Sequence, residues 1–380
     1  MLYLDHAATS PVRPEVLEAM RPYLIGVFGN PSSHHTAGEA AASALEDARM
    51  RVARLLGMRT GDVIFTSGGT EANNLAVKGI VLAGLERGRR HLVTSPIEHE
   101  SILESAAYLE RFHGVTVTLA PVDGTGRVSP AALTAAVRDD TALVSIGHAN
   151  NEIGSVQDAA ALGQVARGAG VPLHLDAVQS AGWLPLAELD ADAISIAGHK
   201  LGAPKGIGAL AVRGRVPLEP LLHGGGQERG RRSGTENVAG AVGLATALEL
   251  AEAERAARAS QVGALTGRFI RGVLDAVPQA ALTGDAEHRL PATASFTFAG
   301  TSGEAVLLEL ERRGVISSSG SACAAGSDEP SHVLLACGIA PETAQTSVRF
   351  TFAREPLQGD APERLAALVA DAVAAVASFK

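Results

Sequence analysis

The chain has 380 residues, 46% of them hydrophobic, and a formal net charge of -9, which is enough for one large core and a second, smaller one. The acidic balance offers no basic face for phosphates and argues against direct nucleic-acid binding, and the longest apolar stretch is too short to span a membrane. Two cysteines cannot form a disulfide framework, as expected for a cytoplasmic protein. The first residues, MLYLDHAATS, lack the basic and apolar regions of a signal peptide, so we expect none.

Short apolar runs alternate with amphipathic helical patterns, such as 70–86 and 98–112, through the first two thirds of the chain. Strands that are apolar on both faces and alternate with helices are typical of a parallel sheet with helical crossovers. The predicted strands are 62–68, 91–96, 115–120, 142–148, 171–176, 193–198 and 208–213. The sequence therefore predicts an α/β fold with a mostly parallel seven-stranded sheet flanked by helices.

The pattern changes after Thr235. A long Ala/Glu/Arg-rich helix, about 237–260, precedes a region with fewer strands. Strands are predicted there at 293–298, 313–319 and 347–352, and helices at 302–313 and 361–379. We predict a large domain over 15–255 and a smaller α+β domain formed by 1–14 and 256–380.

The first strand of the predicted seven-stranded sheet is followed by small and hydroxyl residues, Ser67-Gly68-Gly69-Thr70-Glu71, which open a helix. Backbone N–H groups and a hydroxyl at the positive end of a helix can cup an anion. A plain glycine turn with Thr70 as the helix N-cap explains the same residues equally well.

Reactive side chains follow two later strands, at the sheet edge where such folds bind ligands. Asp176 and Gln179 follow the strand 171–176, and His199-Lys200 follow the strand 193–198. A carboxylate there suits a protonated ring nitrogen, and a partly dehydrated lysine favours the neutral amine that forms a Schiff base. A lone lysine is usually a surface charge. Lys200 together with the anion cup, Asp176 and the preceding His199 favours a cofactor site.

The two cysteines differ in their surroundings. Cys337 lies in VLLACG, an apolar helical stretch, which favours an inert core position. Cys323 lies among small residues with no apolar period, which predicts an exposed loop at about 317–330. An exposed thiol is either incidental or a working nucleophile. No histidine has zinc-ligand spacing with a cysteine, so no metal site is assigned.

Several ordered motifs together resemble the cysteine desulfurases, the NifS/IscS-like branch of the class-V aminotransferase family and of fold-type-I pyridoxal-phosphate enzymes. The resemblance covers nearly the whole chain and includes an SSGSAC form typical of the branch with an extended active-site loop. Its markers are GNPSSHHTAG (29–38), TSGGTEANNLAVKG (66–79), PIEHES (96–101), HANNEIG (148–154), HLDAVQS (174–180), GHKLGAPKGIG (198–208), HGGGQERGRRSGTEN (223–237) and SSGSACAAG (318–326).

The resemblance implies that pyridoxal 5'-phosphate (PLP) is the cofactor. Lys200 would hold it as a Schiff base and shuttle the substrate α-proton, and Asp176 would pair with the ring nitrogen. Gln179 would bond the ring oxygen, and His99 would stack on the ring and assist proton transfer. The phosphate would be bound by the remaining cofactor residues, Gly69, Thr70 and His199, and by Thr235 from the partner subunit of a homodimer.

Two further positions, Asn151 and Arg349, would hold the carboxylate of the substrate L-cysteine, Arg349 in a bidentate pair. Cys323 would take the sulfur as a persulfide and pass it to an acceptor protein, such as an iron–sulfur scaffold or a tRNA-thiolation protein. Ala197 stands where a serine usually contacts the phosphate, and His6 replaces a frequent asparagine.

Three alternatives stay open at this point. A selenocysteine lyase or an aminotransferase would use the same Lys200 and Asp176, although an aminotransferase would not need Cys323. A non-catalytic sulfur-relay scaffold would keep the fold and a surface thiol. Lys200, Asp176 and His99 together favour an enzyme over a scaffold.

Overall fold

The computed structural model describes residues 1–319 and 329–377. Its main sheet has seven strands in the order β2-β8-β7-β6-β5-β3-β4. The strands are β2 (Val63–Thr66), β3 (His91–Thr94), β4 (Thr116–Leu119), β5 (Thr141–Gly147), β6 (Leu173–Asp176), β7 (Ala193–Ala197) and β8 (Gly208–Val212). All seven lie within the predicted ranges or within one residue of them, and five of them are buried along their whole length, as helices on both faces of a sheet require.

One strand of this sheet departs from the parallel arrangement. β8 is antiparallel to both of its neighbours, β2 and β7. Only a short 3-10 segment, η3 (Gly198–Lys200), and a turn separate β7 from β8, which is too little chain for a helical crossover. The carboxyl ends of β2, β3, β5, β6 and β7 consequently share one edge with the start of β8.

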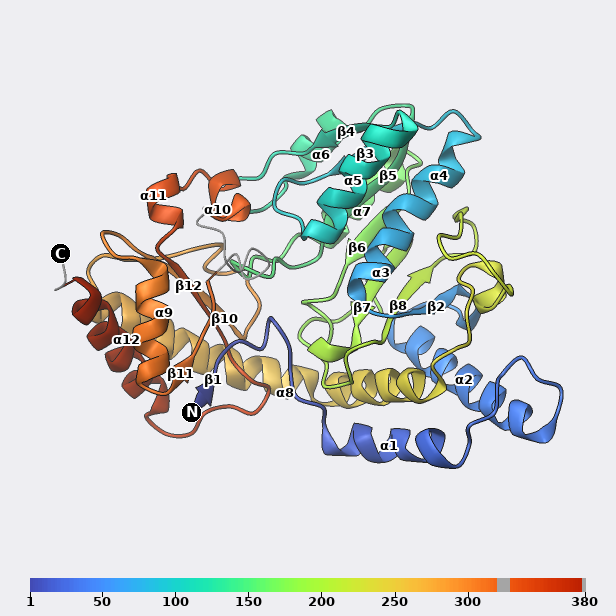
Figure 1. Cartoon of the computed structure of the whole chain (residues 1–380). Coiled ribbons are helices and arrows are strands. Elements are labelled where there is room, and N and C mark those ends of the chain that lie inside the picture. Colours follow the sequence, from blue (N-terminus) through green and yellow to red (C-terminus); the bar gives the residue numbers. More distant parts are fainter. Residues whose placement is uncertain (320–328, 378–380) are drawn as a thin grey trace.

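Helices cover both faces of the sheet (Figure 1). One continuous helical run follows β2 and comprises α3, a π-helical segment η2, and α4. The helices of this part are α1 (Pro14–Ile25), α2 (Thr36–Leu55), α3 (Gly69–Asn74), η2 (Leu75–Gly79), α4 (Ile80–Leu85), α5 (Glu100–His113), α6 (Pro130–Ala136) and α7 (Ala159–Gly168), with short 3-10 turns at η1 (Thr60–Asp62) and η4 (Glu228–Gly230).

The longest helix, α8 (Val238–Ala276), extends well beyond the predicted end near residue 260. Its second half continues because Val262, Leu265, Phe269 and Val273 form a buried stripe at helical spacing. In Figure 1, α8 runs along one side of the whole molecule, from α2 at one end to α12 at the other. The predicted domain boundary at 255 lies inside this helix, and the division into two domains stays a proposal.

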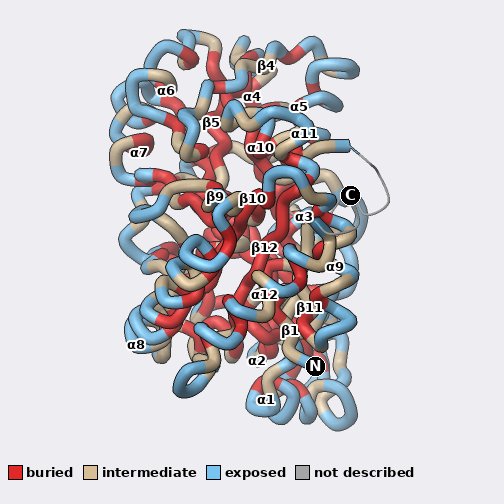
Figure 2. The backbone as a smooth tube through the Cα atoms, turned by 90° about the vertical axis from the view of Figure 1, so that its left-hand side faces the viewer, coloured by how far each residue is buried: buried red, intermediate tan, exposed pale blue. Residues whose placement is uncertain are grey.

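The C-terminal part has its own sheet and core. Three antiparallel strands lie in the order β12-β10-β9, and β1 pairs in parallel with β11. Phe269 of α8 packs edge-on against Phe350 and Phe352, and Figure 2 shows β10 and β12 as buried. The elements are β1 (Leu2–Tyr3), β9 (Ala280–Leu282), β10 (Thr293–Phe298), α9 (Gly303–Arg312), β11 (Val315–Ile316), α10 (His332–Ala336), α11 (Pro341–Ala344), β12 (Ser347–Thr351) and α12 (Ala361–Ala377).

Two features of this part differ from the sequence-based expectation. The strand predicted at 313–319 is only two residues long, because just Val315 and Ile316 pair with β1. β1, β9 and α11 were not predicted, since elements of two to four residues have too little periodicity to be recognised, whereas the helical stretch expected at VLLACG is confirmed by α10.

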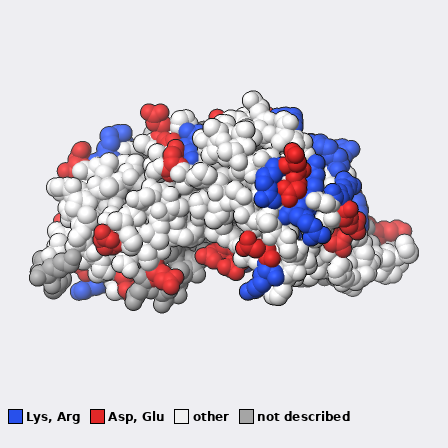
Figure 3. All heavy atoms as spheres, turned by 90° about the horizontal axis from the view of Figure 1, so that it is seen from above, with Lys and Arg blue, Asp and Glu red and all other residues white. Residues whose placement is uncertain are grey.

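The surface carries both signs of charge. In the face seen in Figure 3, Lys and Arg side chains gather toward one end, around a few acidic ones. Within residues 1–319 and 329–377, no helix is long and apolar enough to cross a membrane.

Candidate active site

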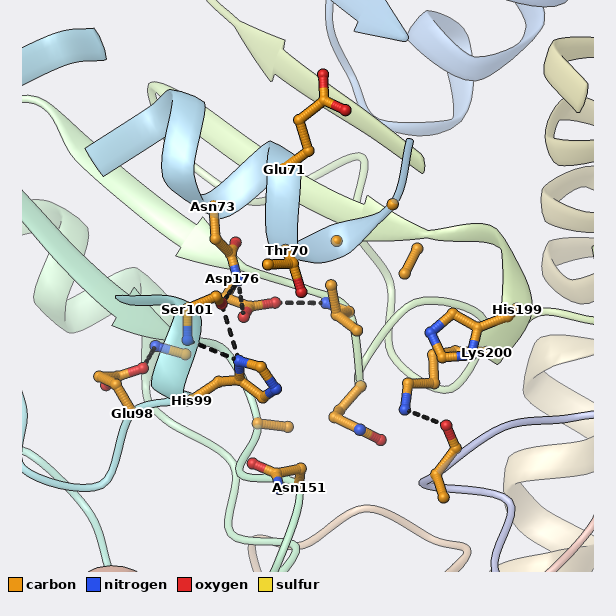
Figure 4. A pocket seen from close by; sticks show the side chains of 18 of the residues that line it. Thr70, Glu71, Asn73, Glu98, His99, Ser101, Asn151, Asp176, His199 and Lys200 are labelled. Carbon is orange, nitrogen blue, oxygen red and sulfur yellow. Dashed lines mark hydrogen bonds between the residues drawn. The ribbon is translucent and has the colours of Figure 1, made fainter. Parts of the chain in front are cut away.

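A cavity of about 430 Å³ lies at the shared strand edge. Segments that follow β2, β3, β5, β6 and β7 line it, together with the residues just before β8, as expected for the carboxyl edge of such a sheet. Eight of the predicted site residues line this one cavity: Gly69, Thr70, His99, Asn151, Asp176, Gln179, His199 and Lys200. Sequence positions more than 100 residues apart therefore meet at one place (Figure 4).

The anion cup that the sequence predicts corresponds to the turn between β2 and α3, and phosphate binding there stays a prediction. The backbone N–H of Ser67 donates to Oε2 of Glu71 at 2.8 Å, while Thr70 is exposed. Gly69 is buried, and a Cβ there would lie 2.8 Å from Cγ2 of Val178. A glycine at this position thus lets the start of α3 lie close to the segment that follows β6.

Asp176 ends β6 with its carboxylate fixed from two sides. Oδ2 accepts from Nδ2 of Asn73 at 2.7 Å, and Oδ1 accepts from the backbone N–H of Val178 at 2.9 Å. The same Asn73 amide donates to Oγ of Ser101 at 2.9 Å. The carboxylate is mostly buried and held rigidly, as a partner for a protonated ring nitrogen must be.

His99 precedes α5 and is oriented by the helix that it caps. Its Nδ1 accepts from the backbone N–H of Ser101 at 3.0 Å and lies 2.8 Å from the Ser101 hydroxyl. This assigns the proton of the neutral ring to Nε2. Burial lowers the pKa of His99, and the negative charge of Asp176 offsets part of that effect. A neutral imidazole is therefore presented to the cavity.

Lys200 approaches the cavity from η3. Its ammonium group donates to the carbonyl oxygens of Ala7 and Ala8, and Nε2 of Gln179 donates to the Ala7 carbonyl at 3.1 Å. His199 lies beside Thr9, with 3.2 Å between Nδ1 and Oγ1. Burial, with Lys200 and Lys205 nearby, lowers the pKa of His199 to about 4. The N-terminal segment 7–9 thus closes the cavity on the Lys200 side, a role the sequence did not indicate.

Glu98 is a site residue that the sequence analysis missed. The residue is 4% exposed, and its carboxyl group accepts from the Ser95 hydroxyl at 2.5 Å and from the Gly147 N–H at 2.6 Å. Burial, reinforced by the charge of Asp176, raises the pKa of Glu98 to about 8. The group connects the segment that carries His99 with the segment after β5. Its place directly before His99 was the available signal.

Arg349 is buried and does not line the cavity. Nη2 donates to Oδ1 of Asp5 at 2.7 Å, and Nη1 donates to the carbonyl oxygen of Asn151 at 2.8 Å. Its Nε has no hydrogen-bond partner among the described residues. The guanidinium therefore lies directly behind Asn151, and its contact with a substrate carboxylate stays a prediction.

The predicted nucleophile, Cys323, lies outside the described residues. The chain on either side of 320–328 lies near the site. Ser318 exchanges backbone hydrogen bonds with Arg349 at 2.7 and 3.2 Å, and Nε2 of His332 lies 3.0 Å from the Glu98 carbonyl oxygen. Ser318 thus contacts the arginine that lies behind Asn151, and His332 contacts Glu98 of the cavity.

Two other predicted positions lie elsewhere. Thr235 is exposed on the segment before α8 and does not line the cavity, so its contact with a partner's phosphate stays a prediction. Cys337 is half-buried, and burial, with Asp123 and Glu152 nearby, raises the pKa of its thiol to about 11. A thiol that holds its proton so strongly is a poor nucleophile.

The described residues fit a phosphate-bearing pyridine aldehyde. The cup offers N–H donors for a phosphate, Asp176 suits a ring nitrogen, His99 can cover the ring, and Lys200 can bond the aldehyde carbon. One buried polar atom beside the cavity, Oδ1 of Asn73, has no partner in the described chain, as expected of a site shaped for a ligand.

Comparisons with known proteins agree with this geometry. The family model described as "Aminotransferase class-V" matches residues 2–360. A protein named "Cysteine desulfurase IscS" from Dictyoglomus turgidum is 45% identical over 92% of this chain and 89% of its own length. A solved structure of a "NifS-like protein" superposes with a TM-score of 0.89 at 34% identity and covers 100% of both chains.

A further solved structure, "SspA in complex with cysteine", is 36% identical with a TM-score of 0.80. It covers 94% of this chain and 100% of its own. These findings confirm the predicted family and fold type, and with them a PLP-dependent class of enzyme.

Proposed function

Because this chain belongs to the class-V aminotransferase family, we propose that it is a PLP-dependent cysteine desulfurase. It takes sulfur from L-cysteine, releases L-alanine and leaves a persulfide on Cys323. The observation that carries this proposal is the convergence of the anion cup, Asp176, His99 and Lys200 on one cavity.

The cofactor is held by residues from several strand ends. The cup with Gly69, Thr70 and His199 would hold the phosphate, Asp176 would pair with the ring nitrogen, and Gln179 would bond the ring oxygen. PLP, once bound, supplies an electron sink for negative charge that develops at the substrate α-carbon. Asp176 sustains that sink because its carboxylate, fixed by Asn73 and Val178, keeps a proton on the ring nitrogen.

Proton transfer is assigned to Lys200 and His99. The Lys200 amine, beside the cofactor that it would hold, would remove the α-proton of L-cysteine. His99, neutral with its proton on Nε2, covers the ring and assists that transfer. Asn151 and Arg349 orient the substrate carboxylate, and their direct contact lets them act as a unit.

Sulfur transfer requires the thiolate of Cys323. It attacks the sulfur of L-cysteine, so that an S–S bond forms as the substrate C–S bond breaks. The electron pair of that bond stays with the carbon, which is protonated and leaves as L-alanine. The sum is L-cysteine plus a protein thiol giving L-alanine plus a protein persulfide, with no external oxidant.

A desulfurase of this kind implies two protein partners, a second subunit and a sulfur acceptor. A homodimer would bring Thr235 of each subunit to the phosphate of the other, and an acceptor for iron–sulfur assembly or tRNA thiolation would receive the persulfide in the cytoplasm. The exposure of Thr235 supports the first of these. Sedimentation of the cofactor-loaded protein should give a dimer, and a fully active monomer would contradict it.

Incubation of the purified protein with L-cysteine and a thiol reductant tests the activity. We expect L-alanine and sulfide in equal amounts and a protein-bound cofactor absorption that a carbonyl-trapping amine removes. Turnover confined to L-selenocysteine would assign a lyase, and amino transfer to a keto acid an aminotransferase. A protein that never binds the cofactor would be a scaffold.

A further inference from the structure

The anion cup contains a negative charge of its own. Glu71 follows Thr70 in the first turn of α3, with its carboxylate pointing away from the Thr70 hydroxyl (Figure 4), and its Oε2 accepts from the Ser67 N–H at 2.8 Å. A carboxylate at this position competes with a phosphate for the positive end of the helix and repels it.

Glu71 is ionised in the folded protein. Burial acts to raise its pKa, but hydrogen bonds from Arg232 and Ser67 outweigh burial and leave the pKa below its usual value. Its side chain is 19% exposed, so water screens the charge only in part. A phosphate-binding turn with an unpaired Glu71 would therefore bind its ligand poorly.

Arg232 supplies the compensating charge from a distant part of the chain. Its Nε donates to Oε1 of Glu71 at 2.8 Å and its Nη2 lies 3.4 Å from Oε2. This two-point geometry is characteristic of a guanidinium facing a carboxylate. The pair joins the segment 223–237 to the start of α3.

The segment that carries Arg232 is held in place by the buried Glu228. Glu228 is 4% exposed and accepts from Arg49 at 2.5 and 2.9 Å and from the Phe65 N–H at 3.1 Å. Glu228 and Arg229 both have left-handed backbone, with φ of 51° and 58°, which residues other than glycine rarely adopt. Such a conformation persists only where surrounding contacts impose it, and here it directs the chain so that Arg232 faces Glu71.

We propose that Arg232 is a positioning residue for the cofactor phosphate, which acts by neutralising Glu71 and holding the anion cup in its binding shape. The inference rests on the proposed function, because it requires PLP to be the ligand. It assigns Arg232 an effect on the phosphate alone, and none on the ring or the aldehyde.

Binding of PLP and of pyridoxal, which lacks the phosphate, separates these effects. With cofactor-stripped full-length protein, Arg232→Gln should weaken PLP binding about tenfold and change pyridoxal binding by less than about twofold. Equilibrium dialysis followed by absorbance gives both dissociation constants. The double variant Glu71→Gln with Arg232→Gln should recover most of the lost PLP affinity, since the glutamine that replaces Glu71 would still accept from Ser67 and no carboxylate would be left unpaired.

Two controls accompany this experiment. Arg232→Lys keeps the charge and should stay within about threefold of the wild type. Arg215→Gln removes the charge of an exposed arginine that pairs with Asp192, away from the cavity and from the segment 223–237, and should leave PLP binding unchanged.

Unchanged PLP affinity in Arg232→Gln, or no recovery in the double variant, would overturn the inference while leaving the proposed function intact. Equal weakening toward PLP and pyridoxal would also overturn it. A wild-type protein that takes up no PLP would contradict the proposed function as well.

Discussion

The cavity and the Arg349 ion pair are built in different ways. Cavity residues such as Asp176 and Lys200 follow neighbouring strands of one sheet, so the sheet itself brings them together. Arg349 belongs to β12 in a different sheet, and among the described residues its guanidinium donates to Asp5 of the N-terminal segment and to the carbonyl of Asn151, which lines the cavity.

The two arrangements suit two kinds of ligand, a resident cofactor and a substrate that exchanges in every turnover. A rigid strand edge can hold a resident cofactor in fixed geometry. The Arg349 guanidinium is paired with the Asp5 carboxylate. A substrate carboxylate can replace Asp5 in this pair and leave again, because the exchange leaves the charge balance unchanged. We infer that the cavity holds the cofactor and that Arg349 meets the substrate.

The largest expected effect is that of Lys200→Ala. Activity with L-cysteine should fall by about 1000-fold or more, because this variant removes both the amine that bonds the cofactor and the base. The absorption of the protein-bound cofactor should disappear in the same spectrum. Its persistence in the variant would show that another amine holds the cofactor.

Arg349→Gln sharpens the comparison. The KM for L-cysteine should rise roughly 10- to 100-fold, as for loss of a charge-assisted hydrogen bond, while the cofactor absorption stays. Asp5→Asn is the matched control, because it breaks the same ion pair and keeps the guanidinium, and its KM should change much less. Equal effects of the two variants would assign Arg349 a structural role instead.

Glu98→Gln tests the acidic group within the cavity wall. The pKa of Glu98 is raised from 4.5 to about 8, so the folded state binds more protons than the unfolded state between these values, and stability falls as pH rises through that window. Glutamine removes this slope. Chemical denaturation of both proteins at pH 5 and pH 8 should show the wild type losing a few kcal/mol relative to the variant.

The quantity to compare is the difference in the free energy of unfolding between the wild type and Glu98→Gln at each pH. The buried His148 and His174, with pKa values lowered to about 4 and about 3 by burial, contribute stability that rises with pH below their usual value, opposite in sign. Both proteins share that contribution. A difference that does not change with pH would mean that Glu98 ionises normally.

Cys337→Ser should have the smallest effect. A half-buried hydroxyl in place of the thiol should lower the free energy of unfolding by about 1 kcal/mol, with turnover per folded molecule unchanged. Thermal melting and a steady-state assay measure the two quantities. Loss of turnover without loss of stability would make Cys337 a participant in the reaction.

The main sheet and most of the cavity could be predicted from the sequence, for a physical reason. Seven apolar runs located the strand ends, and polar residues after those ends, such as Asp176 and His199-Lys200, had to meet at one edge. Small and hydroxyl residues at Ser67–Glu71 likewise located the start of α3, which borders the cavity.

What could not be predicted depends on contacts between distant segments. The N-terminal carbonyls of Ala7 and Ala8 have no sequence signal for closing over Lys200. The burial of Glu98 follows from Ser95 and Gly147, and the pairing of Arg232 with Glu71 joins positions 161 residues apart. Each depends on tertiary packing, which periodicity does not report.

The most direct test of the account is the location of the transferred sulfur. The wild-type protein, treated with L-cysteine in the absence of reductant and digested, should yield by mass spectrometry a peptide that carries one extra sulfur atom on Cys323. Cys323→Ser should keep the cofactor absorption and form no persulfide, because a serine hydroxyl is not ionised near neutral pH without a base. Extra sulfur on Cys337 instead, or a Cys323→Ser variant as active as the wild type, would contradict the desulfurase mechanism proposed for this chain.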